Sequence, residues 1–246
     1  MSVNSMSNIL VFDASSSWCS AALNMDGTLY STADMQPRKH AQLILPMIEN
    51  LCQQAGIKPL ELDGIAFGKG PGSFTGLRIA ISVAQGLSLA TGAKLYGISS
   101  LAALAWQGMK QQQVERVVAI MNAHMGEVFY GAYQKTERGL TSVINDTLAK
   151  PEQVDLVNLL GQPSLDISSW VGVGDGFQFK QELPVVINKL LGIDENLAPM
   201  AESMMDLAMS AWHQGEFTAA ELQQPVYLRD TVAWKKLAEQ PSLLKK

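Results

Sequence analysis

One order of predicted elements, three strands followed by alternating helices and strands, occurs twice along this chain, and this repetition constrains the fold most. In the first copy Asp26-Gly27 is typical of a hairpin turn. The helices of this copy are predicted at 40–55 and 75–90 and end at Gly56 and Gly92. Its strands are predicted at residues 8–12, 18–24, 28–34, 64–67 and 94–98.

The second copy follows the same order. Its helices are predicted at 151–160 and 178–191. Its strands are predicted at residues 116–121, 127–133, 140–148 and 170–173. The opening hairpins also look alike, because Asp13-Ala14 before the second strand of the first copy corresponds to Asn122-Ala123 in the second. The pattern indicates a duplicated unit.

An antiparallel meander followed by helical crossovers predicts an α/β fold with mixed sheets that helices cover on both faces. Two such units resemble the actin-like architecture of sugar kinases and Hsp70, a duplicated ribonuclease-H-like fold with a cleft between the domains. We expect an N-terminal domain at 1–104, completed by a helix at about 198–214, a smaller domain at 105–197 and a tail at 215–246. A length of 246 residues suits two modest domains.

Charge and composition exclude several classes of protein. A net charge of −5 argues against binding of nucleic acid by this chain alone. Cys19 and Cys52 are too few for a disulfide framework. The N-terminus does not resemble a signal peptide, and no apolar stretch approaches the ~18 residues that span a membrane. We therefore expect a cytoplasmic protein with no membrane contact.

Charged residues are unevenly distributed. Residues 1–104 contain 12 of them, and the remaining 142 residues contain 29. Glu49 is the one clearly charged residue of the first predicted helix and Arg78 that of the second, so both helices are apolar beyond a single stripe. Such helices are either covered twice within the core or packed against helices of another chain.

The second interpretation gives a predicted partner interface. We expect Leu43→Asp or Ala84→Arg to abolish binding of a partner and leave the monomer folded. The predicted interface residues are His40, Leu43, Ile44, Met47, Leu51, Thr75, Arg78, Ile81, Ala84, Gln85 and Ser88.

The glycine-rich segment 68–78, GKGPGSFTGLR, connects a predicted strand to a predicted helix. It matches neither the phosphate-binding P-loop, which needs Gly-Lys-Ser/Thr at its end, nor the nucleophile elbow G-x-S-x-G. Two interpretations remain. The glycines allow close backbone packing, with Ser73 or Thr75 as the helix N-cap, or the loop and the preceding strand end bind an anion or a nucleotide. The residues for the second interpretation are Asp13, Gly70, Gly72 and Ser73.

The three histidines, His40, His124 and His213, include no short-spaced pair of metal ligands. We therefore predict neither a metal site nor a catalytic residue in this chain. Without a nucleophile, base or metal constellation the sequence also argues against hydrolase or protease chemistry.

Five segments of the chain resemble one family of proteins. The resemblance extends from Ile9 to Lys236, and its most specific element is Gly70-Pro71-Gly72-Ser73-Phe74-Thr75-Gly76. The segments are HAQLILPMIENL, DGIAFGKGPGSFTGLRIAISVAQGLSLA, YGISSLAALA, NAHMGEVFYGAY and PVYLRDTVAWKK. They are similar to the bacterial TsaB (YeaZ) family, which takes part in making threonylcarbamoyladenosine beside the anticodon of tRNA.

The resemblance implies a non-catalytic activator. It implies a heterodimer with the paralogue TsaD, which transfers the threonylcarbamoyl group to N6 of the adenosine, and a ternary complex with the ATPase TsaE. Contact with tRNA would be indirect, ATP and a metal would belong to the partner complex, and this chain would bind no cofactor alone. The two charge-poor helices would pack against TsaD, and the same face would allow a homodimer when TsaD is absent.

Two departures and two alternatives accompany the resemblance. Residues 97–104 lack the His-x-x-x-His metal motif of the paralogue, and Asn122 and His124 replace the family's usual Asp and Arg. One alternative is an ATP-dependent small-molecule kinase that uses Asp13 and the loop 70–76. Another is a metallopeptidase, for which the ligands are missing. We leave the contacts of 225–236 unassigned.

Overall fold

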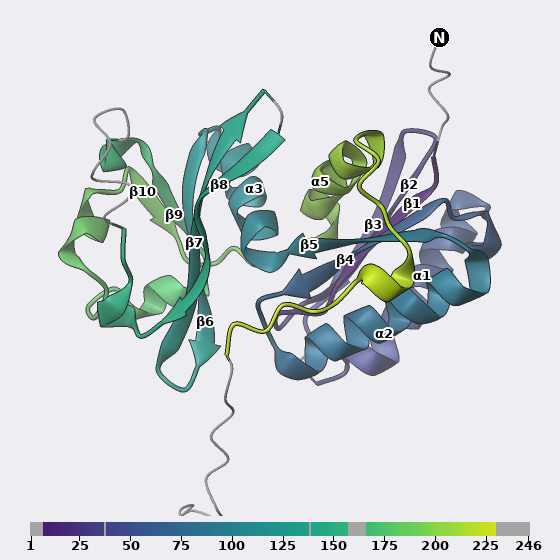
Figure 1. The fold of residues 1–246 in the computed structure, drawn as a ribbon, viewed down its shortest axis with the longest axis horizontal. Helices are drawn as coiled ribbons and strands as arrows, with labels where there is room; N and C mark the ends of the chain where they lie inside the picture. The colour runs from purple at the N-terminus through teal and green to yellow at the C-terminus, as the bar shows by residue number, and fades with distance from the viewer. Residues whose placement is uncertain (1–6, 37, 138, 157–165, 230–246) are drawn as a thin grey trace, which may run out of the picture.

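Two five-stranded sheets, each with helices or turns against its faces, make up the structure, a computed structural model (Figure 1). It describes residues 7–36, 38–137, 139–156 and 166–229. Each sheet belongs to one half of the molecule. This arrangement confirms the predicted fold class.

The first sheet has the order β3-β2-β1-β4-β5. β1 pairs antiparallel with β2 and parallel with β4, so a meander meets crossover strands at β1. The hairpin between β2 and β3 turns at Asp26 (φ 51°) and Gly27 (φ 83°), a pair of residues that tolerate positive φ. The strands are β1 (Ile9–Asp13), β2 (Cys19–Met25), β3 (Thr28–Asp34), β4 (Gly64–Gly70) and β5 (Lys94–Ser99).

The second sheet repeats this topology with the order β8-β7-β6-β9-β10. β6 occupies the place of β1, because it pairs antiparallel with β7 and parallel with β9. The strands are β6 (Arg116–His124), β7 (Glu127–Thr136), β8 (Gly139–Ala149), β9 (Val171–Val173) and β10 (Gly192–Asp194). The duplication predicted from the sequence is therefore confirmed for both sheets.

Helices α1 (His40–Ala55) and α2 (Phe74–Thr91) cover one face of the first sheet. Both end where the sequence predicts, at Gly56 and Gly92 in left-handed conformation. Each helix buries one face and exposes another in this chain, so the interpretation of helices covered twice is wrong.

The other two helices each cover the sheet that they do not follow in the sequence. α3 (Ser100–Gln112) leaves β5 of the first sheet but packs mainly against β6 and β7. α5 (Ala201–His213) leaves β10 of the second sheet but packs against β1 and β2. The boundary predicted after Leu104 thus falls inside α3, and α5 forms within the predicted range 198–214 and lies on the first sheet.

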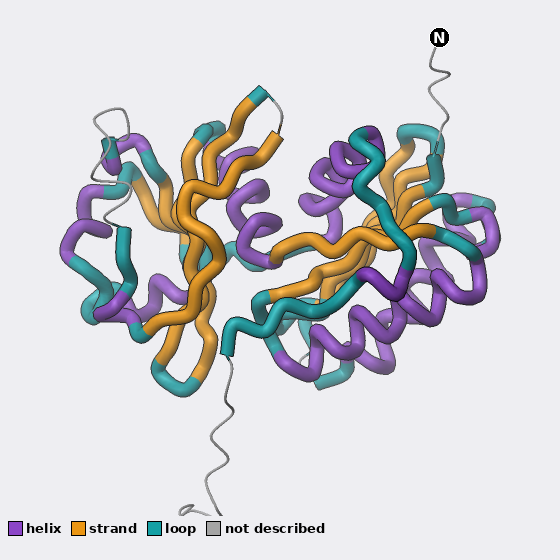
Figure 2. The backbone as a smooth tube through the Cα atoms, in the orientation of Figure 1, coloured by secondary structure: helices purple, strands orange, loops and turns teal. Residues whose placement is uncertain are grey.

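The helices predicted at 151–160 and 178–191 are wrong for the described residues. Short 3-10 turns at Pro151–Gln153 and Val185–Lys189 replace them, and a third turn, Asp175–Phe179, overlaps the start of the second range; Figure 2 colours all three as helix. Pro184 interrupts the second predicted helix, because proline removes an intrahelical hydrogen bond. Residues 157–160 of the first predicted helix lie outside the described residues.

Candidate functional site

A cavity of about 680 Å³ lies between the two halves of the molecule. One wall comes from the first half: the turn after β1, the residues before α1 and the first turn of α2. The other wall comes from the tip of β6 and from the segment before α5. Its polar and charged lining includes Ser15, Ser16, Ser17, Arg38, His40, Ser73, Asn122, His124, Asp175 and Glu195.

The glycine-rich loop packs directly against the turn after β1. A Cβ at Gly76 would lie 1.8 Å from the carbonyl oxygen of Ala14, and one at Gly72 would lie 2.4 Å from that of Ser15. The Ser73 N–H donates to the Ser15 carbonyl at 2.8 Å, and Ser73 Oγ accepts from the Gly76 N–H at 3.3 Å. Close packing and an N-cap at Ser73 are therefore confirmed.

Asp13 is fully buried and does not line the cavity. Its Oδ2 accepts from the Ser15 N–H at 3.1 Å and from Ser15 Oγ at 2.9 Å, and Ser100 Oγ donates to Ser15 Oγ at 2.9 Å. Its Oδ1 faces Gly68, where a Cβ would lie 1.8 Å away. Burial raises the pKa of Asp13 to about 6, although the hydrogen bonds from Ser15 lower it.

The four residues predicted to contact an anion are therefore not brought together. Gly72 and Ser73 line the cavity, whereas Asp13 and Gly70 do not. A Cβ at Gly70 would lie 2.9 Å from Leu77 Cδ1 and 2.9 Å from the Val226 carbonyl oxygen, so this glycine is packed beneath neighbouring chain. For Asp13 and Gly70 the prediction is corrected, because both are in the interior.

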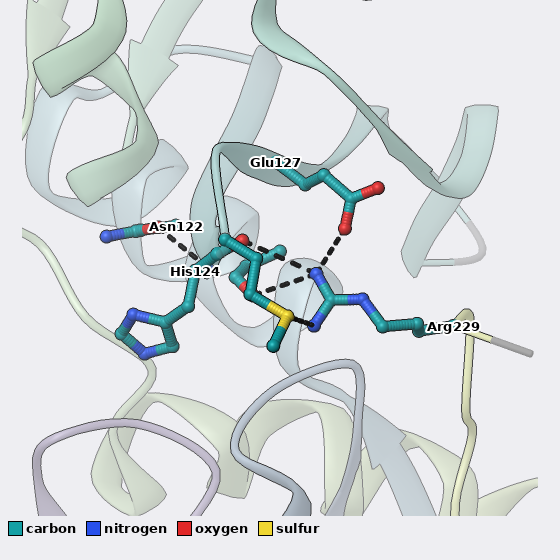
Figure 3. A network of polar contacts seen from close by, with 6 residues as sticks. Asn122, His124, Glu127 and Arg229 are labelled. Carbon is teal, nitrogen blue, oxygen red and sulfur yellow. Dashed lines mark hydrogen bonds and ion pairs between the residues drawn. The ribbon is translucent and has the colours of Figure 1, made fainter. Parts of the chain in front are cut away.

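The corresponding turn of the second half is open to the cavity. The Asn122 N–H donates to Asp175 Oδ1 at 2.8 Å, and Asn122 Oδ1 accepts from the His124 N–H at 2.8 Å (Figure 3). His124 and Met125 have positive φ values of 59° and 57°. Asn122 thus takes the position of Asp13 but organises a turn at the cavity wall.

A partly buried polar cluster joins the two sheets. Ser99 at the end of β5 donates through Oγ to Asp146 of β8 at 2.6 Å and accepts from the Ala102 N–H at 3.1 Å. The hydroxyl of Tyr133 also donates to Asp146. Burial raises the pKa of Asp146, and the Ser99 hydrogen bond opposes this shift. Sequence analysis missed this cluster because its members are far apart in the chain.

The predicted interface residues on α1 and α2 separate into two groups. Those in the core repeat at helical spacing toward the sheet. Because Ala84 is fully buried there, Ala84→Arg would place a charge in the core, so this variant does not test the interface alone. The buried residues are His40, Ile44, Leu51, Ile81 and Ala84, each at most 8% exposed. The exposed or half-buried residues are Leu43, Met47, Thr75, Arg78, Gln85 and Ser88.

Apolar side chains and a groove lie on the outer face of these helices. Leu45 is 51% exposed, Phe74 48% and Leu89 90%. A groove of about 470 Å³ runs between the beginnings of α1 and α2, lined by Ala41, Phe74, Thr75, Arg78, Ile79, Ser82 and Val83. Of the exposed group above, Thr75 and Arg78 line this groove.

No three His, Cys, Asp or Glu side chains in the described part of the chain gather where a metal ion could bind. Within the same residues, every helix is too short or too polar to cross a membrane.

The chain is similar to known proteins over most of its length. The family model of TsaD, tRNA N6-adenosine threonylcarbamoyltransferase, matches residues 34–237. The Escherichia coli (strain K12) tRNA threonylcarbamoyladenosine biosynthesis protein TsaB is 38% identical over 232 residues, 93% of this chain and 97% of that protein. The protein of the same name from Haemophilus influenzae is 33% identical over 239 residues, 93% of this chain and 96% of that protein.

A solved structure agrees with these sequences. YeaZ from Pseudomonas aeruginosa is 38% identical and superposes with a TM-score of 0.83, covering 91% of this chain and 100% of that one. Both the identity and the coverage exceed what a shared fold alone produces. This chain therefore belongs to the TsaB (YeaZ) family.

Proposed function

We propose that this chain is a non-catalytic subunit of the bacterial machinery that attaches a threonylcarbamoyl group to N6 of the adenosine next to the anticodon of tRNA. The observation that carries the proposal is the similarity to TsaB proteins over 93% of the chain. Those relatives are named as biosynthesis proteins of threonylcarbamoyladenosine. The chain takes part in the same biosynthesis.

In this proposal the chain works through a partner. Its paralogue TsaD binds it as a heterodimer and performs the transfer, and the ATPase TsaE joins the pair. ATP and a metal belong to that complex, tRNA is contacted through it, and this chain holds no cofactor alone. The site of action is the cytoplasm.

The outer face of α1 and α2 supports this role. Leu45, Phe74 and Leu89 are apolar and exposed there, beside the groove that contains Ser82 and Val83. Exposed apolar side chains beside a groove are typical of a protein interface. In the absence of TsaD, two copies would meet through the same face as a homodimer.

The kinase alternative is not favoured. It requires Asp13 and the loop 70–76 to bind a nucleotide together, and Asp13 is buried away from the cavity that Gly72 and Ser73 line. The relatives named above match 93% of this chain, and they are named as biosynthesis proteins of a tRNA nucleoside. Neither name describes a small-molecule kinase.

Reconstitution tests the proposal. We expect threonylcarbamoyladenosine in tRNA, measured by nucleoside mass spectrometry, only when this chain, TsaD and TsaE are combined with tRNA, threonylcarbamoyl-adenylate and ATP. Product formed at the same rate without this chain would contradict the proposal.

A pair of matched variants tests the interface. Leu45→Asp places a charge on the α1 face and is expected to remove co-elution with TsaD on gel filtration, together with product formation. Val185→Asp is the control, because Val185 is 80% exposed in the second half, away from α1 and α2. Equal binding by both variants would place the interface elsewhere.

A further inference from the structure

Residues 225–229 make a further connection between the two halves of the molecule, besides α3, α5 and the Ser99–Asp146 contact. In Figure 1 the segment runs along α2 and reaches the tip of β6. Its residues are Pro225, Val226, Tyr227, Leu228 and Arg229, all described and each less than fully exposed. We propose that this segment is an intramolecular clasp that holds the two walls of the cavity at a fixed separation. Arg229 is the residue that attaches the clasp to the second half.

One end of the clasp is anchored to the first half. The Val226 N–H donates to the carbonyl of Lys69 at 2.7 Å, beside the buried Gly70. The ring of Tyr227 lies 5.4 Å from that of Phe74. These contacts attach the segment to the end of β4 and the first turn of α2.

Arg78 strengthens this anchor from α2. Its Nε donates to the Tyr227 hydroxyl at 3.3 Å, and its guanidinium lies 3.7 Å from the centre of the Phe74 ring. A cation over an aromatic face is attracted by the quadrupole of the ring. Arg78, Phe74 and Tyr227 therefore form one layered group.

The other end of the clasp is anchored to the second half. Leu228 packs against the apolar cluster that α3 forms with β6 and β7. The Arg229 guanidinium pairs with the carboxylate of Glu127 and donates to the carbonyls of Ala123 at 3.2 Å and His124 at 3.4 Å (Figure 3). A planar guanidinium is suited to several acceptors held at fixed angles.

The anchors act on both walls of the cavity. Ala123 and His124 line it from the second half, and Thr75 lines it next to Phe74 from the first. Because Arg229 binds the carbonyls of the wall residues themselves, loss of its guanidinium releases the tip of β6 from α2. The halves would then remain joined by α3, α5 and the Ser99–Asp146 contact, which leaves rotation about those elements.

The clasp is tested on the isolated chain, so the outcome is independent of partner binding. Spin labels are placed on Glu49→Cys and Glu182→Cys, two exposed positions in opposite halves, while native Cys19 and Cys52 are buried. Pulsed dipolar spectroscopy should give one narrow distance distribution for the parent chain. Arg229→Ala should broaden it and shift it to longer distances.

A matched arginine serves as the control. Arg116 donates to Ser169 Oγ at 3.1 Å within the second half, so Arg116→Ala removes a surface guanidinium without touching the clasp. This variant should keep the parent distribution. Distributions for Arg229→Ala that coincide with those of the parent and of Arg116→Ala would overturn the proposal.

Amide exchange gives a second readout that does not depend on labels. The Val226 amide is protected by its bond to Lys69, and Arg229→Ala should raise its exchange rate about tenfold, the effect of one lost charge-assisted hydrogen bond. Glu127→Gln keeps an acceptor oxygen and should give a smaller increase. Circular dichroism confirms that each variant is folded, and an unchanged Val226 rate in Arg229→Ala would contradict the clasp.

Discussion

The two halves of the molecule have the same strand order but different coverings. Long helices α1 and α2 cover the first sheet, whereas 3-10 turns around Trp170 and Phe177 cover the corresponding face of the second. The same strand order is therefore compatible with two different coverings. The exposed apolar side chains Leu45, Phe74 and Leu89 lie on the long helices of the first half.

The largest expected effect concerns the buried face of α2, which we compare with the exposed face of the same helix. Ala84 is fully buried against the sheet, so Ala84→Arg should lower the free energy of unfolding by more than about 4 kcal/mol. Urea unfolding measures the loss, and hydrogen exchange should show it first in α1, α2 and β4. Gln85→Arg, at the exposed neighbouring position, should change stability by less than about 0.5 kcal/mol. Similar losses of unfolding free energy in Ala84→Arg and Gln85→Arg would contradict the distinction between a buried and an exposed face of α2.

A smaller effect distinguishes Asp13 from its counterpart Asn122. The pKa of Asp13 is about 6 in the folded chain and 3.8 ordinarily, so between these pH values the folded state holds a proton that the unfolded state has released. Stability should therefore fall as pH rises from about 4 to 6, by roughly 3 kcal/mol in total.

The Asp13→Asn variant lacks this titration, so the difference in unfolding free energy between parent and variant should change across that range and become constant above it. Asp26→Asn, in an exposed hairpin turn, controls for the loss of a carboxylate. Parallel curves for the parent and Asp13→Asn from pH 4 to 7 would contradict the assignment.

The smallest effect concerns the glycine loop of the first half, which leads into α2, whereas Gly172, Gly174 and Gly176 of the second half lead into a 3-10 turn. Gly76→Ala places a methyl group against the Ala14 carbonyl and should cost about 1–3 kcal/mol. Gly86→Ala lies in the same helix with nothing within 4 Å and should stabilise by about 0.5 kcal/mol. Thermal melting of the pair resolves the opposite signs.

Local signals account for what the sequence predicts correctly. The duplicated strand order follows from alternation and turns, the ends of α1 and α2 follow from Gly56 and Gly92, and the cap of α2 follows from Ser73. Each of these depends on neighbours in the chain. The fold class was therefore accessible before any contact was known.

Nonlocal contacts account for the rest. The sequence could not show which flank of α1 faces the sheet, so Ile44 and Leu51 were placed on the interface rather than in the core. The orientation of Asp13 depends on Gly68, and the pairing of Arg229 with Glu127 joins residues 102 positions apart. The spacing of residue types along the sequence does not reveal such pairs.

Because α3 and α5 each cover the sheet that they do not follow in the sequence, neither sheet is complete until late in synthesis of the chain. α3 emerges after β5 but needs the second sheet, and the first sheet lacks the cover of α5 until residue 213 has left the ribosome. An apolar face of the first sheet, with Val11 and Ala66, is therefore open through most of translation. Nascent chains stalled before Ala201 should bind chaperones through that face, and the two halves should become protease-resistant together.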